Sequence, residues 1–284
     1  MLDQALAEPR STSVLEHTDG FVRGRVSIVL PAFNEEANIT QTISKVREQF
    51  EAICTDCEIV VVDDGSRDGT WAAVENLGEK NTHIIGHPRN QGKGYSLKRG
   101  FYHATGEIAF MVDSDMEVWP QDLRAFFAAL DSADIVIGSK RHSNSTVRTP
   151  TIRKFLSLGF NMLEHLLIGV KVSDTQVGVK AARSGALYTI LPSLAVKRYA
   201  FDAELLAVAT LFGFRIKELP VDIDLKASFS GKQVARMLLD LLGIAYRLRV
   251  KKWYQRNFIR MRSTYKPLIT LERTAAIHRN LSNK

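Results

Sequence analysis

The sequence predicts an α/β protein in which a mostly parallel β-sheet lies between layers of helices. Between Val26 and Ile223, short runs rich in β-branched residues alternate with segments of helical character, and this alternation is typical of parallel sheets. The runs are apolar throughout rather than at every second position, as expected for strands that helices cover on both faces. In addition, clusters of acidic, amide and glycine residues directly follow four of these runs.

Each element can be placed from its local pattern. The predicted strands of the first half are residues 26–31, 58–63, 83–87, 107–113 and 134–139. The predicted helices between them are residues 35–51, 69–77, 93–104 and 120–130. Pro120 is expected in the first turn of the last of these helices, where proline is favoured. Further along, the pattern predicts helices at residues 151–170 and 200–212, and strands at residues 175–182 and 215–223.

The composition allows one large folded domain. The chain has 284 residues, of which 45% are hydrophobic and 24% are charged, as is ordinary for globular proteins. We expect a flexible segment at residues 1–22, an α/β domain at residues 23–228, and basic amphipathic helices with a tail at residues 229–284.

Two further structural classes are not expected. Cys54 and Cys57 have no second cysteine pair and no histidine cluster beside them, so the sequence predicts neither a disulfide framework nor a zinc site. The best candidate for a membrane span, residues 155–170, is interrupted by Glu164 and His165. It is also shorter than the roughly 20 apolar residues that a span requires, and we expect no transmembrane helix.

The positive charge is concentrated near the C-terminus. The formal net charge is +7, and nine basic residues lie between Gly231 and Arg262 against one acidic residue, Asp240. Such a concentration favours an anionic partner. The same segment has an apolar stripe at helical spacing, followed by three aromatic residues; these are Val234, Met237, Leu238, Leu241, Ala245 and Leu248, then Trp253, Tyr254 and Phe258.

Two interpretations of this segment remain open. It lies on an anionic membrane surface, as basic amphipathic helices do, or its stripe packs on the domain while its basic face is solvated. The sequence contains no recognised nucleic-acid-binding motif, so a nucleic-acid partner is not expected.

The polar clusters after the strands have a common position in the predicted fold. They are PAFNEE (31–36), DDGSRDGT (63–70), NQGKG (90–94) and DSD (113–115). Each cluster alone is compatible with an ordinary turn. Because ligands of parallel sheets bind at the carboxyl ends of the strands, four such clusters at one edge favour a shared binding site.

Asp113 and Asp115 are the candidate metal ligands. They are two residues apart at the end of a strand, so both carboxylates can approach one cation if the chain bends there. Mg²⁺ and Mn²⁺ prefer oxygen ligands and often use one or two carboxylates together with substrate phosphates. A solitary D-x-D, in contrast, is usually a solvated turn.

Five segments in this order, VSIVLPAFNEE, EIVVVDDGSRDGT, NQGKGYSLKRGF, DSD and DTQVGVKAA, resemble the family 2 glycosyltransferases with the GT-A fold. FDAELL followed by a basic Ser-Gly-Lys segment is most similar to the branch that makes dolichyl- or polyprenyl-phosphate sugars, first the dolichyl-phosphate glucosyltransferases and then the mannosyltransferases. The resemblance covers about residues 24–255.

The resemblance implies a GT-A (Rossmann-like) fold and a metal-dependent, inverting hexosyltransferase. It implies that glucose or mannose moves from UDP-glucose or GDP-mannose to dolichyl or polyprenyl phosphate, with Mg²⁺ or Mn²⁺ as cofactor. The enzyme would be cytoplasmic and attached peripherally to the cytoplasmic face of an anionic membrane surface.

The resemblance also implies roles for individual residues. Those implied for nucleotide-sugar binding are Pro31, Ala32, Asn34, Glu35, Asp63, Asp64, Lys93 and Ser114, with Asp63 accepting a hydrogen bond from the base. Asp113 and Asp115 would hold the metal, which would hold the diphosphate. The basic candidates for binding the acceptor phosphate are Lys140, Arg141, Lys180, Arg198 and Lys232. A phosphate acceptor is already anionic at neutral pH, so no strong general base is required.

Asp202 is the third candidate catalytic residue. It stands where other family members have an aspartate that deprotonates a hydroxyl acceptor, whereas in this branch we expect it to orient the sugar or the acceptor. An acid in the first turn of a helix is also common because it complements the helix dipole.

Other functions remain open at this stage. The same fold could act on a hydroxyl acceptor in a glycolipid or glycan, or the chain could bind nucleotide sugars without catalysis. A nucleotidyltransferase would require a glycine- and arginine-rich first loop, where this chain has PAFNEE. We expect the helix at residues 151–170 to dip into the membrane interface beside the acceptor through Phe155, Leu156, Phe160, Leu163 and Leu167.

Overall fold

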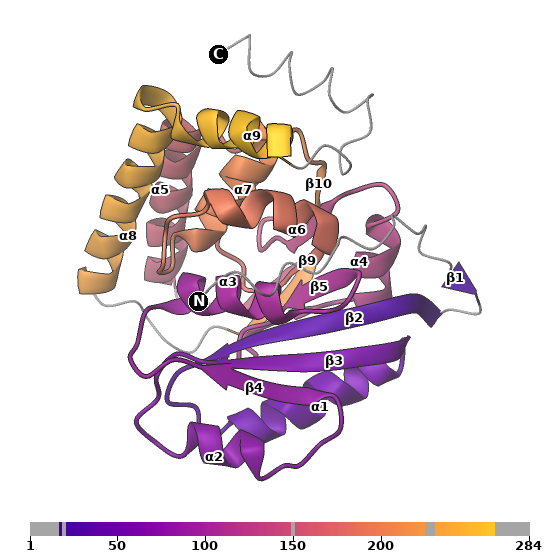
Figure 1. The fold of residues 1–284 in the computed structure, drawn as a ribbon. Coiled ribbons are helices and arrows are strands. Elements are labelled where there is room, and N and C mark those ends of the chain that lie inside the picture. The colour runs from indigo at the N-terminus through magenta and orange to yellow at the C-terminus, as the bar shows by residue number, and fades with distance from the viewer. Residues whose placement is uncertain (1–16, 19–20, 149–150, 225–230, 265–284) are drawn as a thin grey trace.

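The computed structural model describes residues 17–18, 21–148, 151–224 and 231–264 (Figure 1). Within these residues the main sheet has eight strands in the order β10-β7-β9-β5-β2-β3-β4, with β1 paired to β2. The strands are β1 His17–Thr18, β2 Phe21–Ala32, β3 Cys54–Asp63, β4 Thr82–Gly86, β5 Ile108–Met111, β7 Ile135–Gly138, β9 Lys180–Arg183 and β10 Ile216–Leu219. β9 runs antiparallel to β5 and β7, and β1 runs antiparallel to β2, while the other neighbours are parallel. The predicted mostly parallel α/β sheet is confirmed.

A smaller sheet of three strands joins β6 (Val118–Pro120), β11 (Val221–Asp224) and β8 (Thr146–Arg148). Pro220 lies between β10 and β11, and proline cannot donate to a ladder in the middle of a sheet. The single strand predicted at residues 215–223 is therefore divided between the two sheets.

Helix α4 (Leu123–Ala129) begins later than predicted. Pro120 ends strand β6 and pairs with Val221 instead of starting the helix. Oδ1 of Asp122 accepts hydrogen bonds from the amides of Arg124 and Ala125, at 2.9 and 3.2 Å. The prediction for Pro120 was wrong because Asp122 satisfies the free amides of the first turn.

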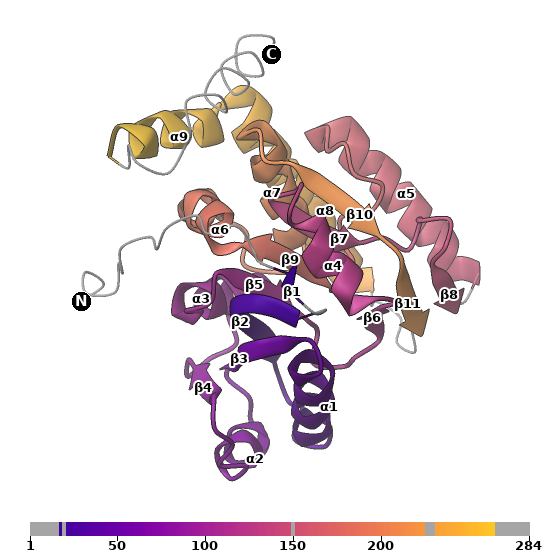
Figure 2. The same ribbon diagram turned by 90° about the vertical axis from the view of Figure 1, so that its right-hand side faces the viewer.

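Helices cover both faces of the main sheet (Figures 1 and 2). On one face lie α1 (Ile39–Glu51), α2 (Thr70–Glu75) and α4, and on the other lie α3 (Lys93–His103), α6 (Ser184–Ile190), η1 (Leu191–Ser193) and α7 (Phe201–Leu211). Successive residues of β3 point to opposite faces. Val60 and Val62 pack in the α3/α7 core, while Ile59 and Val61 pack in the α1/α4 core. This two-sided burial explains why the strands are apolar throughout.

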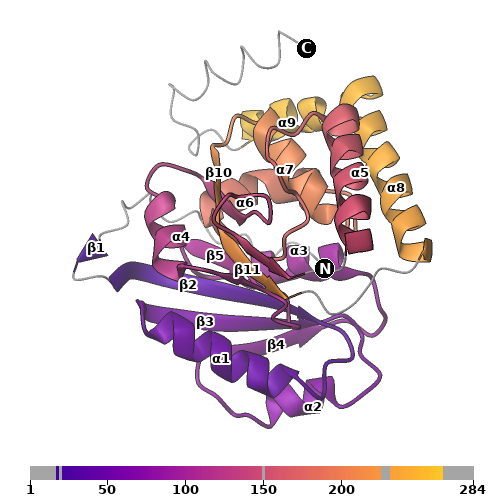
Figure 3. The same ribbon diagram turned by 180° about the vertical axis from the view of Figure 1, so that it is seen from behind.

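The remaining helices form an outer layer over α7. They are α5 (Thr151–Ile168), α8 (Gly231–Ala245), a π-helix η2 (Tyr246–Val250) and α9 (Trp253–Thr264). Figures 1 and 3 show α5 and α8 side by side. In the described part of the chain, no helix is long and apolar enough to cross a membrane.

Several apolar residues of this layer face the opposite way from the prediction. Phe160, Leu163 and Leu167 of α5 pack against the α3/α7 core, and Tyr254 and Phe258 of α9 are buried in it. They turn inward because α7 and η1 offer an apolar surface to pack on. The stripe of α8 packs on the domain, which was one of the two interpretations left open, and Met237 and Leu241 are buried. The side chains of Phe155 and Leu156 lie outside the described residues.

The strand register brings the predicted polar clusters to one edge. Ala32 of β2 is level with Asp63 of β3, which in turn is level with Gly86 of β4. Val29 of β2 is level with Met111 of β5, so residues 113–115 follow at the same height. The fold therefore places all four clusters at the carboxyl edge of the sheet.

Candidate active site

The first two loops of the site are joined by reciprocal hydrogen bonds. The Asn34 amide donates to Oγ of Ser66 at 2.9 Å, and Oδ1 of Asn34 accepts from the Arg67 amide at 2.9 Å. The Gly69 amide donates to Oε2 of Glu36 at 2.8 Å, and the Glu35 amide donates to Oγ1 of Thr70 at 2.8 Å. Asn34 has φ +56°, a conformation that asparagine tolerates better than most residues. In this structure the Asn34 side chain holds the second loop.

A depression of about 370 Å³ lies beside these loops, lined by Asp63, Gly65, Ser66, Trp71, Gly86, His87 and Pro88. Asp63 is buried at the end of β3, and its Oδ1 accepts the Ser66 amide at 3.0 Å. Pro31 and Ala32 are buried at the end of the adjacent strand β2. The depression combines a flat indole ring with a carboxylate, which suits a nucleobase.

Asp64 organises the third loop. Its Oδ1 lies 2.6 Å from Nε2 of His87 and accepts the Gln91 amide at 2.7 Å, and its Oδ2 accepts the Gly92 amide at 2.9 Å. These contacts fix the start of α3, where Gly92 adopts φ +103°. Asp64 thereby positions Lys93, whereas Ser114 is held on the other side through its carbonyl, which accepts from Thr42 Oγ1 at 2.8 Å.

Lys93 reaches the acidic cluster from the first turn of α3. Its Nζ lies 2.6 Å from Oδ1 of Asp113. Burial alone lowers the pKa of Lys93, but attraction to Asp113, Asp202 and Asp115 outweighs it and raises the pKa above its ordinary value. The ammonium therefore lies in the field of three carboxylates, two from the loop after β5 and one from the first turn of α7.

Asp113 and Asp115 offer hard oxygen donors. Burial and the nearby charge of Asp113 raise the pKa of Asp115 to about 6, as expected for two close carboxylates. One oxygen of Asp115 accepts the Glu117 amide at 3.0 Å. The described residues contain no cluster of three or more metal-ligating side chains. The two carboxylates fit a Mg²⁺ or Mn²⁺ ion, which often binds one or two carboxylates and completes its shell with phosphate oxygens and water.

Gly178 makes room for the Asp113 carboxylate. A Cβ atom built on Gly178 would lie 1.9 Å from Oδ2 of Asp113, far inside contact distance. Any other residue at position 178 would displace this carboxylate. Gly178, the glycine of DTQVGVKAA, is therefore needed to leave space for the Asp113 carboxylate and not to form a turn.

Lys180 and Asp202 form a second, buried ion pair. Lys180 Nζ lies 3.1 Å from Oδ1 of Asp202 and also donates to the Val177 carbonyl. The pair lacks hydrogen-bond geometry, and Oδ1 of Asp202 has no hydrogen-bond partner among the residues described. Asp202 belongs to the first turn of α7, which is buried along almost its whole length. Because its ion pair with Lys180 lacks hydrogen-bond geometry, this buried oxygen can still accept a hydrogen bond from a ligand.

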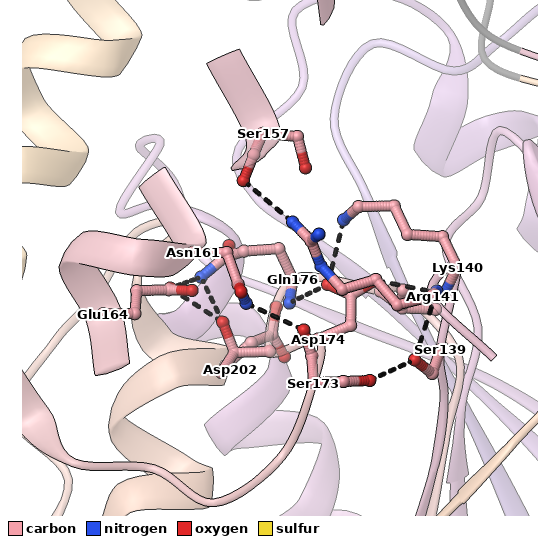
Figure 4. A network of polar contacts seen from close by, with 12 residues as sticks. Ser139, Lys140, Arg141, Ser157, Asn161, Glu164, Ser173, Asp174, Gln176 and Asp202 are labelled. Carbon is pink, nitrogen blue, oxygen red and sulfur yellow. Dashed lines mark hydrogen bonds and ion pairs between the residues drawn. The ribbon is translucent and has the colours of Figure 1, made fainter. Parts of the chain in front are cut away.

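A polar network near Asp202 reaches α5 (Figure 4). Oε1 of Glu164 accepts hydrogen bonds from Thr175 Oγ1 at 2.7 Å and Gln176 Nε2 at 2.8 Å. Burial raises the pKa of Glu164 to about 7, although these hydrogen bonds oppose the shift. Glu164 is thus the acidic residue that interrupts the apolar sequence of α5, and it turns inward.

The predicted acceptor-binding residues are not all brought together. Lys180 lies in the site, and Arg141 donates to the Ser157 carbonyl at 3.2 Å, leaving its Nε buried without a hydrogen-bond partner in the described part of the chain. Lys140 is paired with Asp174 at 2.9 Å. Arg198 is paired with Asp240 at 3.0 Å. Lys232 is exposed on α8.

Sequence reasoning missed a buried polar cluster behind α7. Glu204 is fully buried and accepts the amides of Ala195 and Val196 at 2.9 and 2.7 Å. It also accepts from Arg247 Nη2 at 3.0 Å and from the Tyr254 hydroxyl at 2.5 Å. An acid in the apolar sequence FDAELLAVATLF is the signal that could have identified it, although its partners lie 43 and 50 residues away.

Comparisons with known proteins bear on the family and the fold of this chain. The model of the family described as "Glycosyl transferase family 2" matches residues 27–191. A dolichyl-phosphate β-glucosyltransferase of Trichomonas vaginalis is 35% identical over 82% of this chain and 76% of its own length. An undecaprenyl-phosphate mannosyltransferase of Micrococcus luteus is 27% identical over 69% of this chain and 82% of its own length. Glucosyl-3-phosphoglycerate synthase of Mycobacterium tuberculosis, solved with Mn²⁺, UDP and glucosyl-3-phosphoglycerate, superposes with a TM-score of 0.60 at 19% identity, covering 79% of each chain.

Proposed function

The chain belongs to glycosyltransferase family 2, and from that premise we propose that it transfers a hexose from a nucleotide sugar to dolichyl or polyprenyl phosphate. A phosphate oxygen of the lipid attacks the anomeric carbon, the bond from that carbon to the diphosphate breaks, and the nucleoside diphosphate leaves. Attack from the opposite face inverts the anomeric carbon. The observation that carries the proposal is the convergence of Lys93, Asp113 and Asp115 with the Lys180–Asp202 pair.

The donor would occupy the carboxyl edge of the sheet. The nucleoside would lie in the depression beside Asp63 and Trp71, with UDP-glucose or GDP-mannose as donor. The wall of the nucleoside site would be formed by Pro31, Ala32 and the loop at Asn34 and Glu35, which hydrogen bonds join to the second loop. Asp64 would act through the backbone at Gly92, which it holds in place.

The diphosphate would lie beside the acidic cluster. Asp113 and Asp115 would hold a divalent cation, Mg²⁺ or Mn²⁺, which when bound would neutralise charge on the departing diphosphate. Lys93, with an ammonium that its surroundings keep charged, would supply positive charge next to the same group. Gly178 would keep the Asp113 carboxylate in position.

The acceptor phosphate needs positioning more than activation. Because a phosphate monoester is already anionic at neutral pH, basic side chains that hold it near the donor would supply most of the effect. Arg141, which has a buried Nε without a partner among the described residues, and Lys180 are the best-placed candidates. Asp202 would orient the sugar or the acceptor through Oδ1, which accepts no hydrogen bond from the described residues.

Transfer to a lipid also requires a membrane surface. We place the chain peripherally on the cytoplasmic face, where nucleotide sugars are available. The support is the basic segment at residues 231–262, with nine basic residues against one acidic residue.

The test is an incubation of purified protein with labelled nucleotide sugars, Mg²⁺ or Mn²⁺, and a short-chain polyprenyl phosphate. Label in the organic phase identifies the donor and the acceptor class together. Asp113→Asn and Asp115→Asn should lower transfer by about 100-fold or more, since each removes a metal-binding charge. Glu75→Gln on α2 neutralises an exposed carboxylate and is the matched control. No transfer from any donor, or full transfer by Asp113→Asn, would refute the proposal.

Asp202→Asn separates a phosphate acceptor from a hydroxyl acceptor. If Asp202 deprotonates a hydroxyl, the variant should lose transfer, because a general base contributes about 10²–10⁴-fold. Substantial residual transfer is expected here, since the phosphate needs no base. Loss of transfer with unchanged donor binding would favour a glycolipid or glycan acceptor.

A further inference from the structure

Two outer helices expose large apolar side chains in rows. On α5 these are Leu158, Met162 and Leu166, which are four residues apart, and on α8 and the π-helix they are Leu239, Leu242, Tyr246 and Val250. The residues are between 51% and 69% exposed. Spacings of three and four residues place each row on one side of its helix.

The two rows lie on the same side of the molecule. Helices α5 and α8 stand side by side (Figure 3), and the opposite sides of both pack into the same core through Leu163 and Leu241, among others. Arg249 Nη2 of the π-helix η2 donates to the Leu166 carbonyl at 2.6 Å, which joins the last turn of α5 to the segment that follows α8. We call the seven exposed residues together the α5–α8 face.

Basic side chains line this face along α8, η2 and the start of α9. Exposed arginines and lysines follow or interleave with the apolar row of α8, namely Arg236, Arg249, Lys251, Lys252 and Arg256. The ammonium of Lys251 lies 5.7 Å from the centre of the Tyr246 ring. Asp240, the one acidic residue of the segment, is paired with Arg198. The rim of the face is therefore strongly positive along α8, η2 and α9.

We propose that the α5–α8 face is the surface with which the protein lies on an anionic bilayer. Apolar side chains enter the boundary between headgroups and acyl chains, while basic side chains remain at the headgroups. A lysine or arginine near an anionic membrane contributes about 1 kcal/mol to binding. A second copy of the chain fits less well, because two positive rims would then face each other.

The proposal rests on the proposed function and adds the route by which the lipid acceptor arrives. Arg141 bonds the carbonyl of Ser157, and Leu158 of the α5–α8 face follows directly in the chain. A phosphate group at the level of the lipid headgroups would therefore meet Arg141 beside the edge of this face. The apolar chain of the acceptor stays in the bilayer.

The proposal is specific because the residues of α5 that it assigns to the membrane differ from those that the sequence predicted to enter it. Phe160, Leu163 and Leu167 contact the core and cannot enter lipid unless α5 separates from it. The double variant Met162→Asp/Leu242→Asp places two carboxylates on the face at exposed positions. Ala128→Asp adds a carboxylate on α4, on the opposite side of the molecule, and is the matched control.

The experiment measures co-sedimentation with vesicles of phosphatidylcholine that contain phosphatidylglycerol, at low and high salt. Wild type and Ala128→Asp should bind at low salt and dissociate at high salt. The double variant should bind at least about tenfold more weakly. Hydrogen exchange of the wild type should slow in residues 158–166 and 239–250 when vesicles are added, which tests the face without any substitution.

Activity separates this proposal from the proposed function. The double variant should lose transfer to long-chain polyprenyl phosphate in vesicles and keep transfer to a short-chain acceptor in solution. Vesicle binding that is equal in all three proteins would overturn the docking proposal. The proposal would also be overturned if wild type did not bind vesicles and instead formed dimers through this face, as measured by light scattering. Absence of transfer to both acceptors, together with face-dependent vesicle binding, would support the docking face and refute the enzymatic proposal.

Discussion

The ammonium of Lys93 lies 2.6 Å from a carboxylate oxygen of Asp113, although the two residues follow different strands of the sheet. β2 and β3 separate β5 from β4 in the sheet, and the contact exists because α3, which follows β4, packs across β3 and β2, so its first turn lies beside the loop after β5. Asp113 and Asp115 repel each other, and this repulsion contributes to the raised pKa of Asp115. The positive charge of Lys93 offsets the repulsion. The charge balance of the site is thus set by residues from separate segments.

Lys93→Met should make stability depend on divalent cations. Without Lys93, the two carboxylates repel each other more strongly, and the thermal midpoint in EDTA should fall by about 3 °C or more. Mn²⁺ should raise the midpoint further in the variant than in the wild type, since a bound cation stabilises the folded state. Differential scanning fluorimetry measures both values, with the exposed Lys45→Met as control. Equal Mn²⁺ responses in variant and wild type would contradict this account.

Gly178→Ala should impair the site more than the fold. The added Cβ collides with Oδ2 of Asp113, and the end of that side chain can swing away while the backbone stays in place. We expect weaker Mn²⁺ binding and a roughly 100-fold loss of transfer, with a thermal midpoint close to that of wild type. Gly185→Ala is the control, because a Cβ at Gly185 meets no atom within 4 Å. A loss of activity of the same size in Gly185→Ala would argue against the specific collision.

Arg247 and Tyr254 should stabilise the outer helices through Glu204. Arg247→Met leaves a fully buried carboxylate without its charged partner, which costs about 3 kcal/mol of unfolding free energy. Tyr254→Phe removes one of several hydrogen bonds and should cost about 1 kcal/mol. Urea unfolding measures both. Arg256→Met, an exposed arginine on α9, should change stability by less than about 0.5 kcal/mol, and a larger effect there would weaken the comparison.

Glu164 should give stability a pH dependence between its ordinary pKa of 4.5 and its folded-state pKa of about 7. In that window the folded state holds a proton that the unfolded state has lost. The contribution of Glu164 to the free energy of unfolding is therefore fully present below pH 4.5 and is lost as the pH rises to 7. The total change is roughly 3 kcal/mol.

The measurement compares unfolding free energies of wild type and Glu164→Gln from pH 4.5 to 8. The unfolding free energy of wild type minus that of Glu164→Gln should fall as the pH rises, because glutamine keeps the hydrogen bonds without titrating. Glu48→Gln on the exposed side of α1 is the control. Parallel pH profiles for Glu164→Gln and wild type would show that Glu164 does not titrate in this range.

The sequence was sufficient for the elements that depend on local pattern. The apolar runs at β2 and β3 predicted strands covered on both faces, and Asp113 and Asp115 could be placed at a strand end because chain order fixes that position. The division of the chain at residues 22 and 228 stays a prediction, as do the roles assigned to single site residues. Pro120 was misplaced because its alternative, pairing with Val221, involves a residue 101 positions away.

What the sequence by itself determined is the alternating α/β framework and the acidic groups at the end of its strands, because these follow from local periodicity and from the parallel arrangement. Only the tertiary structure decided which side of α5 and α8 faces outward, since both sides carry leucines and the choice depends on the core provided by α7. The tertiary structure also decided which basic residues are paired. Arg198 meets Asp240, and Lys180 meets Asp202, because long-range packing brings each pair together in a way that no local pattern encodes.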